Sequence, residues 1–112
     1  MQKYRVSVSS AATDKIAEYA IYIAEQSCSL DVADRWIDRV FDAIDGLDFF
    51  PQRFGLAEED AHRDFEIRRL VIGNYLALYH VNDDAKTVRV IGFRHASRLP
   101  RPEELPDDPE IA

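Results

Sequence analysis

The first alternation of apolar and polar side chains lies at residues 4–8, which read Tyr-Arg-Val-Ser-Val. Successive side chains of a strand point to opposite faces of a sheet, so this alternation predicts a short strand with one apolar face. Apolar residues then recur at helical spacing, which predicts an amphipathic helix over about residues 11–27. Ser9 or Ser10 can cap this helix, because a serine hydroxyl accepts a hydrogen bond from a free backbone N–H at a helix N-terminus.

A second helix is predicted by the strongest periodic signal in the chain. Ser29 or Asp31 is a suitable N-cap, Gly46 weakens the helix near its end, and Pro51 lies beyond it. The short link between the two helices predicts an antiparallel helical hairpin. The apolar stripe of the second helix has the spacing i, i+3, i+4, i+7 and consists of Ala33, Trp36, Ile37, Val40, Phe41, Ile44 and Leu47.

The second half of the chain begins with a polar loop at residues 51–64 and then changes to strand-like patterns. Gly73-Asn74 is the kind of pair that closes a β-hairpin, and a polar run at residues 82–86 predicts a second turn. Three strands are therefore predicted, at residues 65–72, 75–81 and 88–93.

Together these elements predict an α+β domain with the order β-α-α-β-β-β. The helical hairpin is expected to pack on one face of a mostly antiparallel sheet, and the strand at residues 4–8 is expected to pair into the same sheet. Four aromatic side chains stand on the apolar stripe or in the apolar strands, and we expect all of them in the core: Trp36, Phe41, Tyr75 and Tyr79.

A chain of 112 residues is long enough for one domain with a hydrophobic core of its own. Residues 1–99 are expected to form that domain. Residues 100–112 hold four of the five prolines and five acidic residues, a composition that predicts a frayed, solvated tail.

Several classes of protein are excluded by simple features of the sequence. Cys28 is the only cysteine, so no disulfide can form within the chain, and no Cys/His cluster has the spacing of a zinc site. No apolar run approaches the ~20 residues that a membrane helix needs, and no apolar signal segment follows Met1. We therefore expect a cytoplasmic protein that uses no membrane segment, metal or cofactor.

The formal net charge of −7 is unevenly distributed along the chain. Residues 1–62 hold 6 basic and 12 acidic side chains, residues 63–101 hold 8 and 4, and residues 102–112 hold 0 and 5. The acidic total argues against direct binding to nucleic acid, because like charges repel. The basic stretch instead predicts one positive face for an acidic partner, with five candidate partner-binding residues: Arg68, Arg69, Arg94, Arg98 and Arg101.

The ordered set of segments resembles the RelE/ParE superfamily of type II toxin–antitoxin toxins, and most of all its ParE-like, plasmid-stabilisation branch. The similarity covers roughly residues 4–99. It is carried by Ser10–Ile16 and Tyr22–Ala24 in the first helix, the stripe after Ala33, the exit Leu47–Pro51, the segment Arg69–Tyr79, and Val88–Ile91 followed by His95 and Arg98.

This resemblance implies a toxin that arrests bacterial growth unless a cognate antitoxin binds it, with the C-terminal segment of the antitoxin wrapped around the toxin. ParE-like members target DNA gyrase, and RelE-like members cleave mRNA in the ribosome. The resemblance therefore implies an antitoxin and DNA gyrase as partners, in a homodimer or a toxin–antitoxin hetero-oligomer. An exposed edge strand would offer the partner a place to add a strand of its own.

The residues present favour the gyrase inhibitor over the ribosome-dependent endoribonuclease. Cleavage of mRNA needs groups that activate the 2′-hydroxyl, protonate the leaving oxygen and stabilise the charge on the phosphate. Where the nuclease branch carries two lysines and an arginine on its strands, this chain has Glu66, Arg68 and Leu76. The remaining catalytic candidates are Arg68, His95 and Arg98. A third hypothesis is an interaction module without toxic activity, kept for antitoxin binding.

Overall fold

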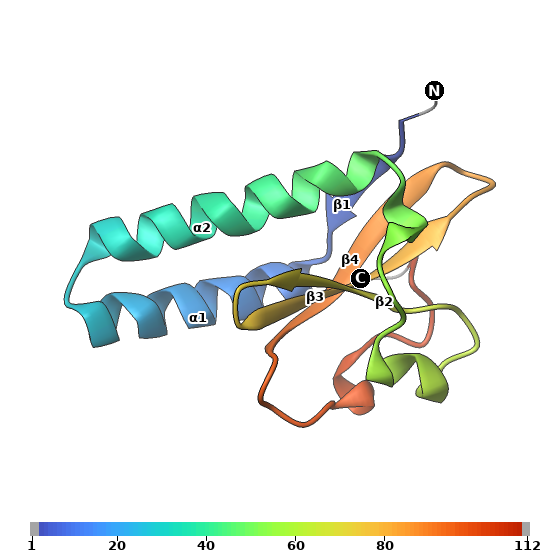
Figure 1. Cartoon of the computed structure of the whole chain (residues 1–112). Helices are drawn as coiled ribbons and strands as arrows, with labels where there is room; N and C mark the ends of the chain where they lie inside the picture. The colour runs from blue at the N-terminus through green and yellow to red at the C-terminus, as the bar shows by residue number, and fades with distance from the viewer. Residues whose placement is uncertain (1–2, 111–112) are drawn as a thin grey trace.

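The computed structural model describes residues 3–110. Two helices form a long hairpin that covers one face of a four-stranded sheet, which confirms the predicted α+β order (Figure 1). No helix in this described part of the chain is long and apolar enough to cross a membrane. The elements are β1 (Arg5–Val8), α1 (Ser10–Ser27), α2 (Leu30–Asp45), β2 (Arg68–Ile72), β3 (Tyr75–Asn82) and β4 (Thr87–His95).

Both helices begin at serine caps. The Ser9 hydroxyl accepts a hydrogen bond from the Ala12 N–H at 3.0 Å, and the Ser29 hydroxyl accepts one from the Val32 N–H at 3.2 Å. Of the alternatives that the sequence offered, Ser9 and Ser29 are therefore the caps. Cys28 ends α1 with a left-handed backbone (φ 55°), which turns the chain directly into α2.

The strand order is β1-β4-β3-β2. β4 pairs antiparallel with β3, which pairs antiparallel with β2, whereas β1 runs parallel to β4 from Arg5, opposite Thr87, to Val8, opposite Val90. The sheet is thus mixed and mostly antiparallel, as predicted. The expected turn between β2 and β3 is also confirmed, and Gly73 supplies the positive φ of 59° that this turn requires.

The main hydrophobic core lies between the helical hairpin and the sheet. Trp36 is 7% exposed and Tyr79 is fully buried, as predicted. Phe41 and Tyr75 are partly buried and pack against the same core. Trp36 and Tyr75 meet edge to face, with ring centroids 5.0 Å apart, so the α2 stripe contacts the aromatic end of the sheet directly.

A second hydrophobic core covers the opposite face of the sheet, and the sequence pattern did not predict it. Ala57, Ile67 and Leu105 are buried against Leu78 and Ile91 of the sheet. The segment expected as a polar loop therefore contributes core residues. The expectation of a frayed, solvated tail is likewise wrong for the part of the tail that carries Leu105, which is only 8% exposed.

Arg63 holds this part of the tail, residues 101–107, in place. Its guanidinium donates hydrogen bonds to the carbonyl oxygens of Pro102, Leu105 and Pro106, at 2.5, 2.9 and 3.1 Å. We call residues 101–107 the C-terminal strap. Because its backbone is bonded and Leu105 is buried, the strap is part of the folded domain.

Replacing Gly92 with alanine is expected to lift the strap. A Cβ at this position would lie 2.6 Å from Leu105 Cδ2 and 3.3 Å from Leu78 Cδ1. The Leu105 side chain must therefore move away from the sheet. We expect a loss of about 1 kcal/mol in the free energy of unfolding and faster proteolysis within the strap. Gly55→Ala is the control, since nothing lies within 4 Å of the added Cβ. Equal behaviour of the two variants would contradict this role of Gly92.

Candidate functional site

A groove opens where the side of α1 meets the end of β4. Its volume is about 440 Å³. Aromatic rings form much of its wall, and two cationic side chains, Lys15 and Arg98, belong to its lining. We call it the α1–β4 groove, and its lining residues are Lys15, Glu18, Tyr19, Tyr22, Tyr75, His95, Ser97 and Arg98.

His95 is fixed in this groove by contacts on several sides. Its ring nitrogen Nδ1 accepts a hydrogen bond from the Ser97 N–H at 3.1 Å and lies 2.7 Å from Ser97 Oγ. Its ring meets Tyr75 edge to face at 5.0 Å, and its backbone N–H donates to the Tyr19 hydroxyl at 3.2 Å. Since Nδ1 accepts from a backbone N–H, this arrangement places the ring proton of a neutral His95 on Nε2.

The phenol of Tyr75, in the wall of the groove, favours its neutral form. Burial raises the pKa of Tyr75, and the neighbouring hydroxyls of Tyr19 and Tyr22 raise it further. The Tyr75 hydroxyl is therefore a hydrogen-bonding group without negative charge at neutral pH. Such a group suits a partner segment that brings its own carboxylates.

The positive charge of the groove is only partly neutralised. Lys15 lies 3.7 Å from a Glu18 carboxylate oxygen and 4.0 Å from one of Glu104, both in partly solvated pairs of little strength. Arg101 pairs with the same Glu104 at 3.4 Å. Arg98 is exposed and completes the basic rim.

Beside this groove, the outer edge of β4 has no paired strand beyond Val90 in the described part of the chain, although the His95 N–H is bonded to Tyr19. β1 pairs with β4 only as far as Val90, and within residues 3–110 no strand lies beside Ile91–His95 on that edge. A smaller cavity of about 110 Å³ follows this edge and shares Lys15, Tyr19 and Arg98 with the α1–β4 groove. An extended segment could thus add a strand to the sheet here while its side chains reach the groove.

Arg94 has a structural position. It is 8% exposed, and its Nε and Nη2 donate to the two carboxylate oxygens of Glu59 at 2.7 and 3.3 Å. Glu59 itself is 1% exposed, and Arg94 Nη1 also donates to the Arg98 carbonyl oxygen at 3.0 Å. The guanidinium is fully engaged inside the domain, so we remove Arg94 from the candidates for partner binding.

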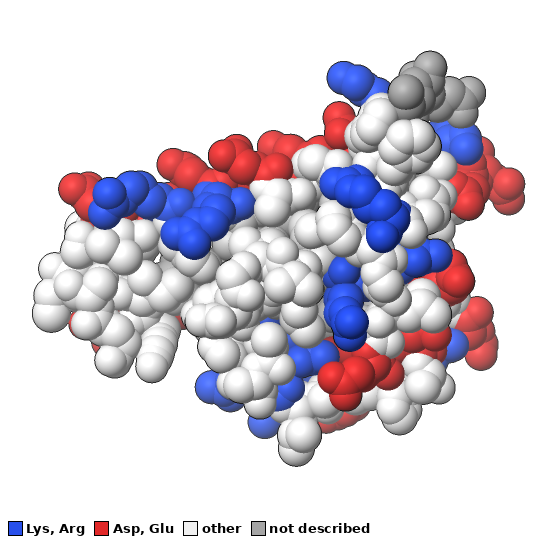
Figure 2. All heavy atoms as spheres, viewed as in Figure 1, with Lys and Arg blue, Asp and Glu red and all other residues white. Residues whose placement is uncertain are grey.

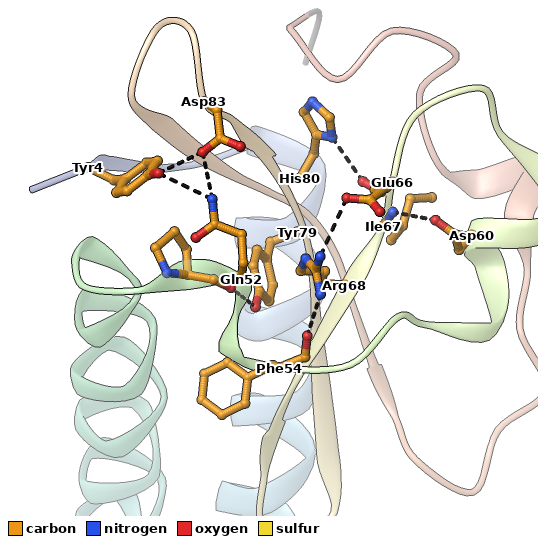
Figure 3. A network of polar contacts seen from close by, with 11 residues as sticks. Tyr4, Gln52, Phe54, Asp60, Glu66, Ile67, Arg68, Tyr79, His80 and Asp83 are labelled. Carbon is orange, nitrogen blue, oxygen red and sulfur yellow. Dashed lines mark hydrogen bonds and ion pairs between the residues drawn. The ribbon is translucent and has the colours of Figure 1, made fainter.

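Arg68 lies at the start of β2, opposite Tyr79 of β3, and takes part in a separate network of polar contacts (Figure 3). Its Nη1 donates to the Phe54 carbonyl oxygen at 2.6 Å, and its Nη2 lies 3.5 Å from a Glu66 carboxylate oxygen. The side chain is 18% exposed, whereas the neighbouring Arg69 is exposed. Arg68 thus holds the loop before β2 in place.

The three nuclease candidates are therefore not all brought together. In the sheet, Arg68 is opposite Tyr79 and His95 is opposite Tyr75. The two positions are therefore four residues apart along β3. At about 3.3 Å per residue, this separation is about 13 Å along the strand alone. Only His95 and Arg98 share a site, the α1–β4 groove.

The predicted single positive face does not include all five candidate residues. With Arg94 buried, the remaining candidates divide between the end of β4 and the β2 edge, and acidic side chains lie between the basic groups on the face shown in Figure 2. Carboxylates also follow the outer side of α2 in that view. The sequence does not indicate Lys15, Tyr19 and Tyr22 as site residues, because only the fold brings α1 beside the end of β4.

Comparison with known proteins agrees with the fold. A chain of the crystal structure of the archaeal RelE-RelB complex from Pyrococcus horikoshii OT3 is similar with a TM-score of 0.56 and 18% sequence identity. The similarity covers 87% of this chain and 99% of that chain, and at this identity it shows the fold alone. A search of curated protein sequences gives no match. Residues 6–100 match the family described as the ParE toxin of the type II toxin-antitoxin system, parDE, so the chain belongs to the ParE toxin family.

Proposed function

We propose that this ParE-family toxin arrests growth by binding DNA gyrase and is neutralised by its cognate antitoxin. The observation that carries this choice is the separation of Arg68 from His95 and Arg98, about 13 Å by strand geometry. Arg68 is also bonded to the Phe54 carbonyl oxygen and to Glu66, so it does not reach a phosphate held by His95 and Arg98. Inhibition by protein contact needs no catalytic group. Both proposed partners act in the cytoplasm, where we place the protein.

The α1–β4 groove is our candidate site for the antitoxin. Its exposed cation Arg98, together with Arg101 of the smaller cavity beside it, complements an acidic segment. The unpaired edge of β4 at Ile91–Arg94 supplies backbone groups for an added strand. The tyrosine rings of the groove offer apolar surface for such a segment. An amphipathic, acidic and extended segment would use all three features at once.

Expression without the antitoxin tests the toxin and its target together. We expect growth arrest with filamentation and a DNA-damage response while translation continues, because gyrase inhibition spares the ribosome. The purified protein should inhibit supercoiling by gyrase, and addition of the antitoxin should restore it. Normal growth would support the interaction module without toxic activity, and unaffected supercoiling would contradict the gyrase proposal.

The endoribonuclease is the second candidate, because His95, Ser97 and Arg98 meet in one groove with Lys15. If the gyrase proposal holds, the double variant His95→Ala/Arg98→Ala should arrest growth as strongly as the wild type. Loss of a general base or acid in a nuclease would instead lower its rate by about 10²–10⁴-fold. Measurement of growth and mRNA integrity after induction separates the two: intact mRNA with wild-type arrest supports the inhibitor, and loss of both arrest and cleavage supports the nuclease.

A further inference from the structure

The segment between α2 and β2 contains a tightly anchored turn, residues 46–54, which we call the aromatic turn. The Asp48 carbonyl oxygen accepts a hydrogen bond from the Tyr4 N–H at 2.9 Å. The Arg53 guanidinium donates to the carbonyl oxygens of Phe49, of Phe50 at 3.0 Å and of Gly46 at 3.3 Å. These bonds fix the backbone on both sides of the two phenylalanines.

The second half of the aromatic turn is anchored to the sheet (Figure 3). Pro51 is buried, and its carbonyl oxygen accepts a hydrogen bond from the buried Tyr79 hydroxyl at 2.5 Å. The Gln52 amide donates to Asp83 at 2.6 Å and to the Tyr4 hydroxyl at 3.2 Å. The turn is therefore fixed to Tyr79 of β3, to Asp83 after β3 and to Tyr4 before β1.

The side chains that this anchored turn carries point outward. Phe49 is 42% exposed and Phe50 is 57% exposed, and their rings meet edge to face with centroids 4.5 Å apart. Neither ring belongs to the two hydrophobic cores. A pair of phenylalanines that remains about half exposed leaves apolar area in contact with water, which is unfavourable.

The backbone of Phe50 adds a second cost. Its φ of 45° and ψ of 58° lie in the left-handed region, which a bulky residue rarely adopts. Glycine or asparagine would form the same turn with less strain. The chain thus keeps an aromatic residue where both solvent exposure and backbone conformation oppose it, and such outliers cluster at functional sites.

We propose that the Phe49–Phe50 pair is a preformed anchor that inserts into an apolar pocket of the toxin's folded target. This inference rests on the proposed function, in which that target is DNA gyrase. Rigid aromatic side chains dominate the binding energy of many interfaces, because little entropy is lost when they are ordered beforehand. The exposed Arg53 guanidinium, 4.4 Å above the Phe54 ring, holds the turn and adds positive charge beside the two phenylalanines.

The shape of the surface around Phe49 and Phe50 favours a folded target over the antitoxin as the partner that contacts the two rings. The two rings do not line the α1–β4 groove or the smaller cavity beside it, so they offer nothing into which an extended segment could be laid. A projecting pair of rings needs a pocket on the partner, and a folded protein has one. The aromatic turn also shares no residue with the α1–β4 groove, so target and antitoxin would contact different surfaces.

The variant Phe50→Gly tests this proposal without unfolding the protein. Glycine adopts the left-handed backbone readily, so the thermal midpoint should stay equal or rise. Gyrase binding should weaken by at least about tenfold, the usual loss at an aromatic hot spot, and growth arrest should fall accordingly. Leu30→Ser is the matched control, because Leu30 is also an exposed apolar residue, 76% accessible, and should leave target binding and arrest unchanged.

The outcomes separate this inference from the proposed function. Full gyrase binding and arrest by Phe50→Gly would overturn the anchor. Weakened antitoxin binding with intact arrest, or dissociation of a dimer, would also overturn it by assigning the pair to another partner. If the wild type arrests growth without binding gyrase, the gyrase proposal fails, and loss of arrest in Phe50→Gly still supports an anchor for a different target. No arrest by the wild type would overturn both.

Discussion

Replacing Glu59 with alanine is expected to lower the free energy of unfolding by about 3–5 kcal/mol. Glu59 is 1% exposed and is the only described carboxylate that holds Arg94 through two hydrogen bonds. Removal of the carboxylate leaves a buried guanidinium without its counterion, and a buried charge without a partner is strongly unfavourable. Urea denaturation followed by circular dichroism measures the loss.

Glu58→Ala is the matched control for this prediction. Glu58 approaches Arg94 at 3.8 Å, but its side chain is 70% exposed, so the pair is screened by water. The control should cost less than about 1 kcal/mol. Equal losses for the two variants would show that Arg94 gains its stabilisation from the acidic segment as a whole and not from Glu59.

A double variant separates the cost of an unpaired charge from the value of the pair. Glu59→Leu with Arg94→Met removes both charges and retains apolar volume, so most of the lost stability should return. Since Arg94 also donates to the Arg98 carbonyl oxygen, the charged pair positions the chain at the rim of the α1–β4 groove. We therefore expect the double variant to fold well and to bind the antitoxin less tightly than the wild type. Equal affinity would contradict this positioning role.

The local elements follow from local sequence, and for that reason they could be predicted. The α2 stripe that includes Trp36 and Ile44 repeats at the helical period, and serine caps act through neighbouring backbone groups. Gly73 marks a turn by its own conformational freedom. Each of these signals lies within a few residues of the feature that it predicts.

The features that were missed depend on residues far apart in the sequence. Glu59 and Arg94 are separated by 35 positions, and nothing in the acidic run around Glu59 shows which of its carboxylates is buried. Leu105 stands among prolines and acids, so its composition indicates a solvated tail, although Gly92 leaves room for it on the sheet. Only the fold shows these pairings.

The candidate site shows the same limit. His95 and Arg98 are close in sequence and lie in one groove, as a local interpretation suggests. Residue type alone groups Arg68 with them, yet strand register places Arg68 opposite Tyr79, four positions along β3 from the partner of His95. The sequence also gives no sign of the left-handed backbone at Phe50, since this residue is neither glycine nor asparagine.

The buried hydroxyl of Tyr79 should make the fold sensitive to alkaline pH. Burial raises the pKa of Tyr79 to about 12, although nearby Arg68 and Arg53 act to lower it, whereas the ordinary value is 10.0. Between these values the unfolded chain releases the phenolic proton and the folded chain keeps it, so stability is fully present below pH 10 and is lost as the pH rises toward 12. The loss approaches about 2–3 kcal/mol, at 1.36 kcal/mol per pKa unit.

Tyr79→Phe isolates this effect. At pH 8 the variant should be less stable by about 1–3 kcal/mol, because the buried Pro51 carbonyl loses its 2.5 Å hydrogen bond. As the pH rises above 10, only the wild type loses the contribution of this phenol, so the two stabilities should converge. Other tyrosines, Tyr75 included, titrate in both proteins and cancel in the difference. Urea denaturation between pH 8 and 11.5 measures that difference, and a constant gap would mean that the Tyr79 hydroxyl ionises as easily in the folded chain as in the unfolded one.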